Sequence, residues 1–268
     1  MSITFSTAWY IFKSKFNPSI YKKWMDNMLS NVHEYYLVVY TDIDGFHYIR
    51  PYLKNPRIKV VFKSYDEFCT YKYKDDWIKN HEKNHYLNGR IDWKLNMLWC
   101  EKINFVNETM KHNYFKTDFF GWCDIGYFRG NSNDLGYDVL SKWPSNHKIL
   151  ALKHDKVYYA CVNNNNQYLY ELSSIINDKN EMGLPKIEIP PYQLSIAGGF
   201  FISHRYKMEW WRKTFYDKLD LYFKNDYLIK DDQIIIADCV FSSINDFELI
   251  EEESPEYDNW FLFQRFLL

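Results

Sequence analysis

Two consecutive segments decide the fold of this chain: LNMLWCEKINFVNETM (residues 95–110) and FFGWC (residues 119–123). The first segment predicts a long helix. The second is a short, fully apolar run, which is typical of a strand buried on both faces of a parallel sheet. It ends abruptly at Asp124. A helix that leads into a buried strand with a polar exit is a repeating unit of α/β folds.

The same alternation continues on both sides of these segments. Short apolar runs predict further strands at residues 2–9, 36–40, 58–62 and 198–203. Helical patterns occupy residues 18–28, 209–221 and 231–241. We therefore expect an α/β fold with a mainly parallel central sheet and helices on both faces. No internal repeat and no linker rich in Pro, Gly or Ser interrupts residues 1–268, so we expect a single domain.

The composition excludes several classes of protein. Of the 268 residues, 47% are hydrophobic and 25% are charged, so the chain can build a core and is not intrinsically disordered. Lys and Arg number 33 against 35 Asp and Glu, which gives a net charge of -2. This balance excludes a dominant electrostatic attraction to nucleic acid, and we expect no nucleic-acid partner.

The cysteines and the N-terminus indicate the compartment. The chain has five dispersed cysteines and no C-x-x-C pair, which is typical of reduced thiols in a cytosol. The segment MSITFSTAWYIFKSKF lacks the basic and apolar regions of a signal peptide. No run approaches the ~20 apolar residues that span a bilayer. We expect a soluble, cytoplasmic protein without a transmembrane segment.

Ligands of parallel α/β sheets bind beyond the carboxyl ends of the strands, and the first polar exit is FFGWCDIGYFRG (residues 119–130). Asp124 could hold a divalent cation against a diphosphate. Gly126 lets a ligand approach the backbone closely, and Arg129 follows. The alternative is a plain turn, because Asp and Gly are ordinary strand-exit residues.

A second segment with candidate site residues surrounds the predicted strand at residues 198–203. In SIAGGFFISHRYKMEWW (residues 195–211), Gly198 and Gly199 could pass beneath a sugar, or could form a bulge before a core strand. His204 is a candidate metal ligand or a surface residue.

In KDDQIIIADCVF (residues 230–241), Asp231, Asp232 and Gln233 precede an apolar helix. They could bind sugar hydroxyls or act as a general base, or one of them could only cap the helix. Asp231 is the expected cap, which leaves Asp232 to face the ligand.

Four further residues complete the candidate set for donor binding. Thr41 and Asp42 follow the strand at residues 36–40, where a simple turn is the alternative. Lys102 lies on the helix before Asp124, where a single lysine is usually only solvated. Thr7 lies in the first strand.

Taken in order, five pieces of the chain resemble the HtrL/YibB-like family, which belongs with the GT-A-type nucleotide-sugar glycosyltransferases. They are LVVYTD (37–42), WCEKINFV (99–106), NYFKTDFFGWCDIGYFR (113–129), AGGFFISHRYKMEWW (197–211) and DDQIIIADCVF (231–241). Their order is also similar to the DxD, NAG and DQD motifs of glycogenin-like transferases. The resemblance implies a single Rossmann-like GT-A domain, with a nucleotide-binding half at residues 1–130 and an acceptor-side half at residues 131–268.

The resemblance also implies roles for the candidates. Asp124 would take the first position of DxD and hold Mn²⁺ or Mg²⁺ against the diphosphate, with Lys102 near the phosphates or the sugar. The Gly pair would line the donor sugar, and residues 231–233 would face donor and acceptor. The second Asp of DxD is Gly126 here, and no histidine follows His204. One carboxylate and the diphosphate can nevertheless hold Mg²⁺, because this ion keeps several waters.

We therefore expect a metal-assisted glycosyltransferase that moves a sugar from a nucleoside-diphosphate sugar, first of all a UDP-sugar, to a glycan or other hydroxyl acceptor. If the reaction inverts, Asp232 or Asp231 is the base; if it retains, they position the donor sugar. One alternative is a catalytically inactive module that binds nucleotide sugars. The other is a nucleotidyltransferase, which would need further acidic ligands and a Gly-rich phosphate loop.

Overall fold

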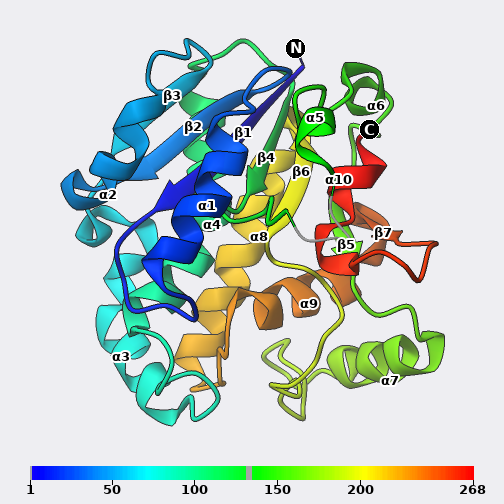
Figure 1. The fold of residues 1–268 in the computed structure, drawn as a ribbon. Coiled ribbons are helices and arrows are strands. Elements are labelled where there is room, and N and C mark those ends of the chain that lie inside the picture. Colours follow the sequence, from blue (N-terminus) through cyan, green and yellow to red (C-terminus); the bar gives the residue numbers. More distant parts are fainter. Residues whose placement is uncertain (1, 131–134) are drawn as a thin grey trace.

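The structure is a computed structural model that describes residues 2–130 and 135–268. Within these residues, the chain forms a sheet of seven strands (Figure 1). Its spatial order is β3-β2-β1-β4-β6-β5-β7. The strands are β1 (Ile3–Trp9), β2 (Tyr36–Thr41), β3 (Ile58–Phe62), β4 (Phe119–Cys123), β5 (Val157–Cys161), β6 (Phe200–His204) and β7 (Phe247–Glu251).

The strand directions create a crevice beside β1. Strands β3, β2, β1 and β4 are mutually parallel, and β5 is parallel to β7. Strand β6 is antiparallel to both of its neighbours. The chain runs outward from β1 to β3 and then returns to β4 on the other side of β1. Such a reversal of strand order opens a binding crevice at the carboxyl ends of β1 and β4.

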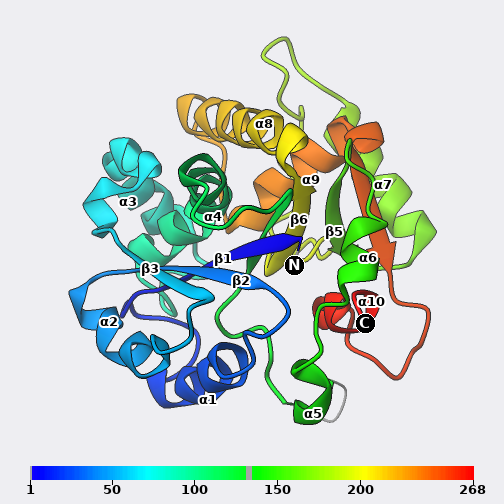
Figure 2. The same ribbon diagram turned by 90° about the horizontal axis from the view of Figure 1, so that it is seen from above.

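Helices cover both faces of the sheet, as Figure 2 shows. One face packs against α3 (Lys74–Lys83), α4 (Trp93–His112), α7 (Asn166–Asn177), α8 (Arg205–Lys224) and α9 (Asp232–Ser242). The other face packs against α1 (Pro18–Leu29), α2 (Ile43–Ile49), α5 (Tyr137–Leu140), α6 (Asn146–Leu150) and α10 (Phe263–Phe266). In the described part of the chain, no helix combines the length and the apolar character needed to cross a membrane.

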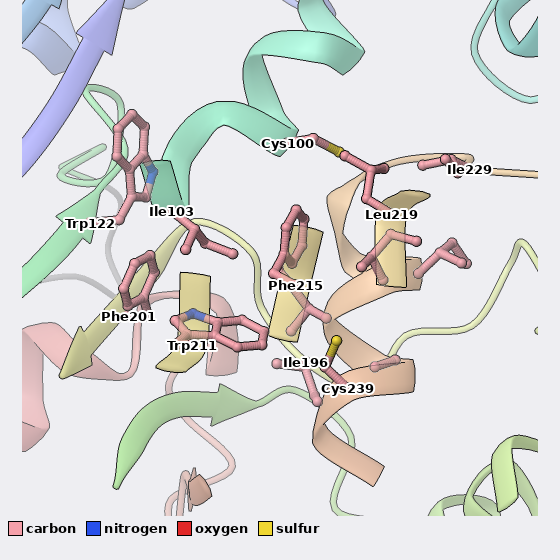
Figure 3. Close-up of a cluster of buried hydrophobic side chains, with 14 of the residues drawn as sticks. Cys100, Ile103, Trp122, Ile196, Phe201, Trp211, Phe215, Leu219, Ile229 and Cys239 are labelled. Carbon is pink, nitrogen blue, oxygen red and sulfur yellow. The ribbon is translucent and has the colours of Figure 1, made fainter. Parts of the chain in front are cut away.

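Strand β4 is apolar throughout because its side chains point alternately to the two faces of the sheet, and both faces are buried. Phe120 and Trp122 join the cluster under α4, α8 and α9, whereas Phe119 and Cys123 join the cluster on the opposite face. Figure 3 shows part of the first cluster, which includes Trp211 of α8 and Phe201 of β6. Strands that are buried on both faces have no polar side to alternate with.

The structure confirms the expected α/β fold with its mainly parallel sheet, and every predicted strand and helix is present within a few residues of its predicted bounds. The sheet takes strands from both halves of the chain, which makes it a single domain. The boundary expected at residue 131 falls outside the described residues. Strands β5 and β7 were not predicted.

Candidate active site

Three segments meet at the carboxyl end of β4. Strand β6 runs antiparallel to β4, so the start of β6 lies beside the end of β4, with Phe200 opposite Cys123. The Gly198–Gly199 pair that precedes β6 therefore lies next to Asp124, whose backbone N–H donates to the Gly199 carbonyl (2.9 Å). The first residues of α9 complete the group. The candidate residues 124, 198–199 and 231–233 thus come together as the strand-end argument predicts.

Lys102 joins these segments from α4. Its ammonium lies 3.2 Å from Asp124 Oδ1 and 3.1 Å from Asp232 Oδ2, and it donates to the Gly198 carbonyl (2.9 Å). Burial alone would lower the pKa of Lys102, but the two carboxylates outweigh it and raise the pKa above its ordinary value. Lys102 is therefore a fixed cation at the bottom of the site, and we call Lys102, Asp124, Gly198 and Asp232 the floor.

The two carboxylates of the floor have different environments. Asp124 is 41% exposed at its side chain, and its Oδ1 accepts a 2.6 Å hydrogen bond from the Trp122 indole. Asp232 is only 7% exposed. Burial raises the pKa of Asp232; Lys102 lowers it, Asp231 and Asp124 raise it, and the result is about 6. A carboxyl group with such a pKa is suited to accept a proton near neutral pH.

Asp231 corrects one detail of the sequence analysis. It occupies the N-cap position of α9, as expected, but its side chain makes no capping hydrogen bond. Its carboxylate pairs instead with Lys230 (3.1 Å). The neighbouring Gln233 donates to the Ile196 carbonyl (2.6 Å), which ties α9 to the segment before the Gly pair.

The Gly pair lies in tight contact with both acids. A Cβ atom on Gly198 would lie 2.9 Å from Asp232 Oδ2, and one on Gly199 would lie 3.1 Å from Asp124 Oδ2. Any side chain here would push a carboxylate away from Lys102. Close approach of the backbone, rather than a positive φ, explains glycine at these two positions.

We expect Gly198→Ala to reduce activity while the protein remains folded. The added methyl would displace the Asp232 carboxylate, which belongs to the floor. A displacement of about 1 Å can lower the rate by about 100-fold. Turnover and the urea unfolding midpoint of the variant would be compared with those of Gly89→Ala, because nothing lies within 4 Å of a Cβ at that loop position. Wild-type turnover in Gly198→Ala would contradict a catalytic floor.

Above the floor lies an open cleft with two adjoining parts, whose empty space is about 760 and about 990 Å³ when the solvent-filled mouth is included. Both parts are lined by Tyr21, Trp99, Lys102, Asp124, Gly126 and Arg129. The first part, at the end of β1, is otherwise mainly apolar, with residues 8–12, Leu95 and Leu98. The second is polar and includes the Gly pair and residues 231–233.

Arg129 lies in an aromatic wall of this cleft. Its guanidinium carbon is 4.5 Å from the ring centroid of Trp24, 4.9 Å from Phe261 and 5.5 Å from Phe16. Stacking of this kind holds an arginine in place and leaves its N–H groups at the ring edges able to bind an anion.

Several residues that line the polar part were missed by the sequence analysis: Lys15, Phe16, Tyr21, Trp99, Asp258, Trp260 and Phe261. The strand-end rule applied to residues 2–9 would have pointed to the loop at residues 10–17. The C-terminal residues 258–261 follow no predicted strand, and nothing in the sequence indicates that they return to this cleft.

Four candidates lie away from the cleft. Thr7 is fully buried within β1, and Thr41 donates to the Trp9 carbonyl (2.7 Å). Asp42 caps α2 by accepting from Gly45 N–H (2.8 Å). His204 pairs with Phe119 at the far end of β4.

His204 therefore cannot share a metal ion with Asp124, and the expectation that it does so is corrected. The two residues lie at opposite ends of the five-residue strand β4, because β6 runs antiparallel to it. The His204 ring instead stacks on His154 with a centroid distance of 4.1 Å.

The donors around Asp124 do not fit the divalent-cation site that the resemblance implies. Asp124 Oδ1 already contacts the Trp122 indole and the Lys102 ammonium, which leaves only Oδ2 for a metal ion. Gly126 offers no carboxylate. Among the described residues, no group of three or more His, Cys, Asp or Glu side chains could hold a metal ion.

No family model and no curated protein matches the chain, so the resemblance to the HtrL/YibB-like family stays a prediction. Among solved structures, the apo form of mouse xyloside xylosyltransferase 1 is similar, with 10% identity over 93% of this chain and 85% of that one, and a TM-score of 0.46. A 4-diphosphocytidyl-2C-methyl-D-erythritol synthase from Anaerococcus prevotii gives 12% identity over 96% and 91%, and a TM-score of 0.41. Likeness at this level bears on the fold alone, and the functional argument below rests on the site.

Proposed function

We propose that the protein is a glycosyltransferase of GT-A type, which moves a sugar from a nucleoside-diphosphate sugar to a hydroxyl group of a glycan or another acceptor. The observation that carries this proposal is the floor. One ammonium, Lys102, links a strand-end carboxylate to a buried carboxylate whose pKa is about 6. This places a cation, a hydrogen-bond acceptor and a candidate base within one small volume.

The two parts of the cleft suit the two ends of such a donor. The apolar part at the end of β1 includes the rings of Tyr10 and Trp99 and suits a flat nucleobase. The polar part suits a sugar with many hydroxyl groups. Arg129 and Lys102 line both parts, where the diphosphate would lie. Arginine binds phosphate oxygens in pairs, and a buried ammonium stabilises developing negative charge.

The transfer itself forms one bond and breaks another at the anomeric carbon of the donor. The acceptor oxygen bonds to this carbon, while the bond from the carbon to the diphosphate oxygen breaks and its electron pair leaves with the nucleoside diphosphate. In an inverting reaction, Asp232 accepts the proton of the acceptor hydroxyl. In a retaining reaction, the same carboxylate holds the donor sugar.

The test is a thermal-shift series with UDP, GDP and their sugar derivatives, followed by transfer and donor-hydrolysis assays with the nucleotide that binds. A ligand that binds only the folded state stabilises it by about 2.7 kcal/mol at 100 times its Kd. We expect a dose-dependent rise in Tm with one nucleotide, and release of that nucleotide from its sugar. No shift with any nucleotide sugar would contradict the proposal.

A catalytically inactive binding module is the second candidate, and Gly126 favours it because the DxD-like motif has lost its second carboxylate. The same experiment separates the two. A module would raise Tm with a nucleotide sugar but would neither hydrolyse it nor transfer the sugar.

A further inference from the structure

The positive charge at the floor comes from a side chain of the protein, the Lys102 ammonium. Lys102 Nζ lies within 3.2 Å of three oxygens, from Asp124, Gly198 and Asp232, which come from three different segments. These contacts hold the ammonium beside the strand-end carboxylate. A divalent ion at Asp124 would have to share that carboxylate with a positive charge 3.2 Å away.

Aromatic side chains fill the space beside Gly126, where the second aspartate of a DxD motif would lie. A Cβ atom on Gly126 would lie 3.0 Å from Trp24 Cε3 and 3.5 Å from the ring of Tyr21. An aspartate here would push the ring of Trp24, on which Arg129 stacks. The aromatic wall that holds Arg129 therefore takes up the space in which a second metal ligand would begin.

Among the described residues, no acid pairs with the Arg129 guanidinium. Its Nε–H makes one long hydrogen bond, to the Gly126 carbonyl (3.4 Å). The rings of Phe16, Trp24 and Phe261 fix the plane of the guanidinium beside the cleft. A fixed, planar guanidinium can bind two phosphate oxygens at once.

Lys15 adds a third positive charge from the loop between β1 and α1. Its ammonium lies 4.9 Å from the ring centroid of Trp99 and lines the polar part of the cleft. Within the described parts of the chain, its ammonium forms no ion pair. Lys15 therefore reaches the cleft from the loop before α1 and Arg129 from the segment after β4, while Lys102 lies on α4.

We propose that the cleft binds a diphosphate through Arg129 and Lys15, and that neither binding nor turnover needs a divalent cation. The inference rests on the proposed function, in which a nucleoside diphosphate is the leaving group. It differs from the resemblance, which implies Mn²⁺ or Mg²⁺ at Asp124. Arg129 and Lys15 supply positive charge beside the diphosphate, and Lys102 occupies the carboxylate at which a metal ion would bind.

Calorimetric titration with inorganic pyrophosphate tests the inference, because pyrophosphate contains the diphosphate without a base or a sugar. The titration is done in metal-free buffer with EDTA, and again with MgCl₂ in place of EDTA. UDP and GDP are titrated under the same two conditions. We expect pyrophosphate to bind in EDTA, with a Kd within about threefold of the value in Mg²⁺, and we expect added salt to weaken the binding.

Variants identify the groups responsible. We expect Arg129→Ala to weaken binding in EDTA by about tenfold or more, and Lys15→Ala by several-fold, because hydrogen bonds to charged groups are lost. Arg129→Lys should recover only part of the loss, because an ammonium cannot bind in a bidentate manner. The control is Arg205→Ala, which removes one exposed charge at the far end of β4 and should change the Kd by less than about twofold. Lys15 lies on an exposed loop, so its variant remains informative even if Arg129→Ala unfolds.

The outcomes separate this inference from the proposed function. Binding of pyrophosphate and nucleotide only in Mg²⁺ would overturn the inference and leave the transferase intact. An unchanged Kd in both Arg129→Ala and Lys15→Ala would also overturn it. Binding in EDTA without turnover of any nucleotide sugar would leave the diphosphate site intact and count against the transferase.

Discussion

Replacing Lys102 with methionine is expected to abolish transfer and to lower the free energy of unfolding by about 3–5 kcal/mol at pH 8, the cost of removing one partner of a buried ion pair. The side chains of Lys102 and Asp232 are 8% and 7% exposed, so Asp232 would be left as a buried charge without a counter-ion. Asp124 is 41% exposed and contributes less, because water screens it.

The loss in Lys102→Met should depend on pH. Without the ammonium, the Asp232 carboxyl can avoid the penalty by taking up a proton, which is easier at pH 5 than at pH 8. Urea unfolding at both pH values would show a larger difference from wild type at pH 8. The control is Lys83→Met, which removes a half-buried partner of the exposed Asp226 and should cost no more than about 1 kcal/mol.

A double variant distinguishes charge from packing. Lys102→Met combined with Asp232→Asn removes both members of the pair and should recover much of the stability at pH 8, although transfer remains absent. An equal loss of stability at pH 5 and pH 8, with no recovery in the double variant, would show that Lys102 acts through the packing of its side-chain carbons.

The strand-end rule predicted most of the floor because it depends only on topology. Asp124 and the Gly pair follow or precede apolar runs, and the ends of neighbouring strands meet at one edge whatever the details of packing. Lys102 was only a weak candidate, because a single lysine on a helix is usually solvated. Its link to both Asp124 and Asp232 depends on how α4 and α9 pack over the sheet, which no local pattern specifies.

The errors have equally definite causes. His204 was misplaced because an apolar run does not reveal strand direction, and the antiparallel direction of β6 puts this residue at the far edge. The aromatic wall around Arg129 joins Phe16, Trp24 and Phe261 from both ends of the chain. Such contacts between distant segments cannot be deduced from spacing along one sequence.

Asp232→Asn is expected to reduce kcat by roughly two to four orders of magnitude if Asp232 is the base, which is the usual cost of losing a general base. The substitution keeps the size of the side chain and removes its charge. Affinity for the nucleotide should hardly change, because the diphosphate contacts other residues. Asp231→Asn is the matched control, since that carboxylate is occupied by Lys230.

The pH dependence gives the same role a second readout. The base must be ionised to accept a proton, so kcat/KM of the wild type should fall as the pH drops through about 6, the value to which burial chiefly raises the pKa of Asp232. The residual kcat/KM of Asp232→Asn should not show this fall at acidic pH. Profiles measured from pH 5 to pH 9 for both proteins would test this.

Stability should change in the opposite direction from activity. Because the pKa of Asp232 in the folded protein is raised above its ordinary value of 3.8, the stabilisation from its bound proton is complete below that value and is lost as the pH rises through about 6. Asp232→Asn carries no charge to bury, and Asp124 remains as a counter-ion of Lys102, so at pH 8 it should lose much less stability than Lys102→Met. Full activity in Asp232→Asn, or a dead Asp231→Asn beside it, would show that the base lies elsewhere. If Asp232 only capped the helix, Asp232→Asn would keep its activity, because asparagine caps a helix about as well as aspartate. A capping role therefore cannot explain a variant that stays folded at pH 8 but loses its activity, and whose residual kcat/KM does not fall at acidic pH.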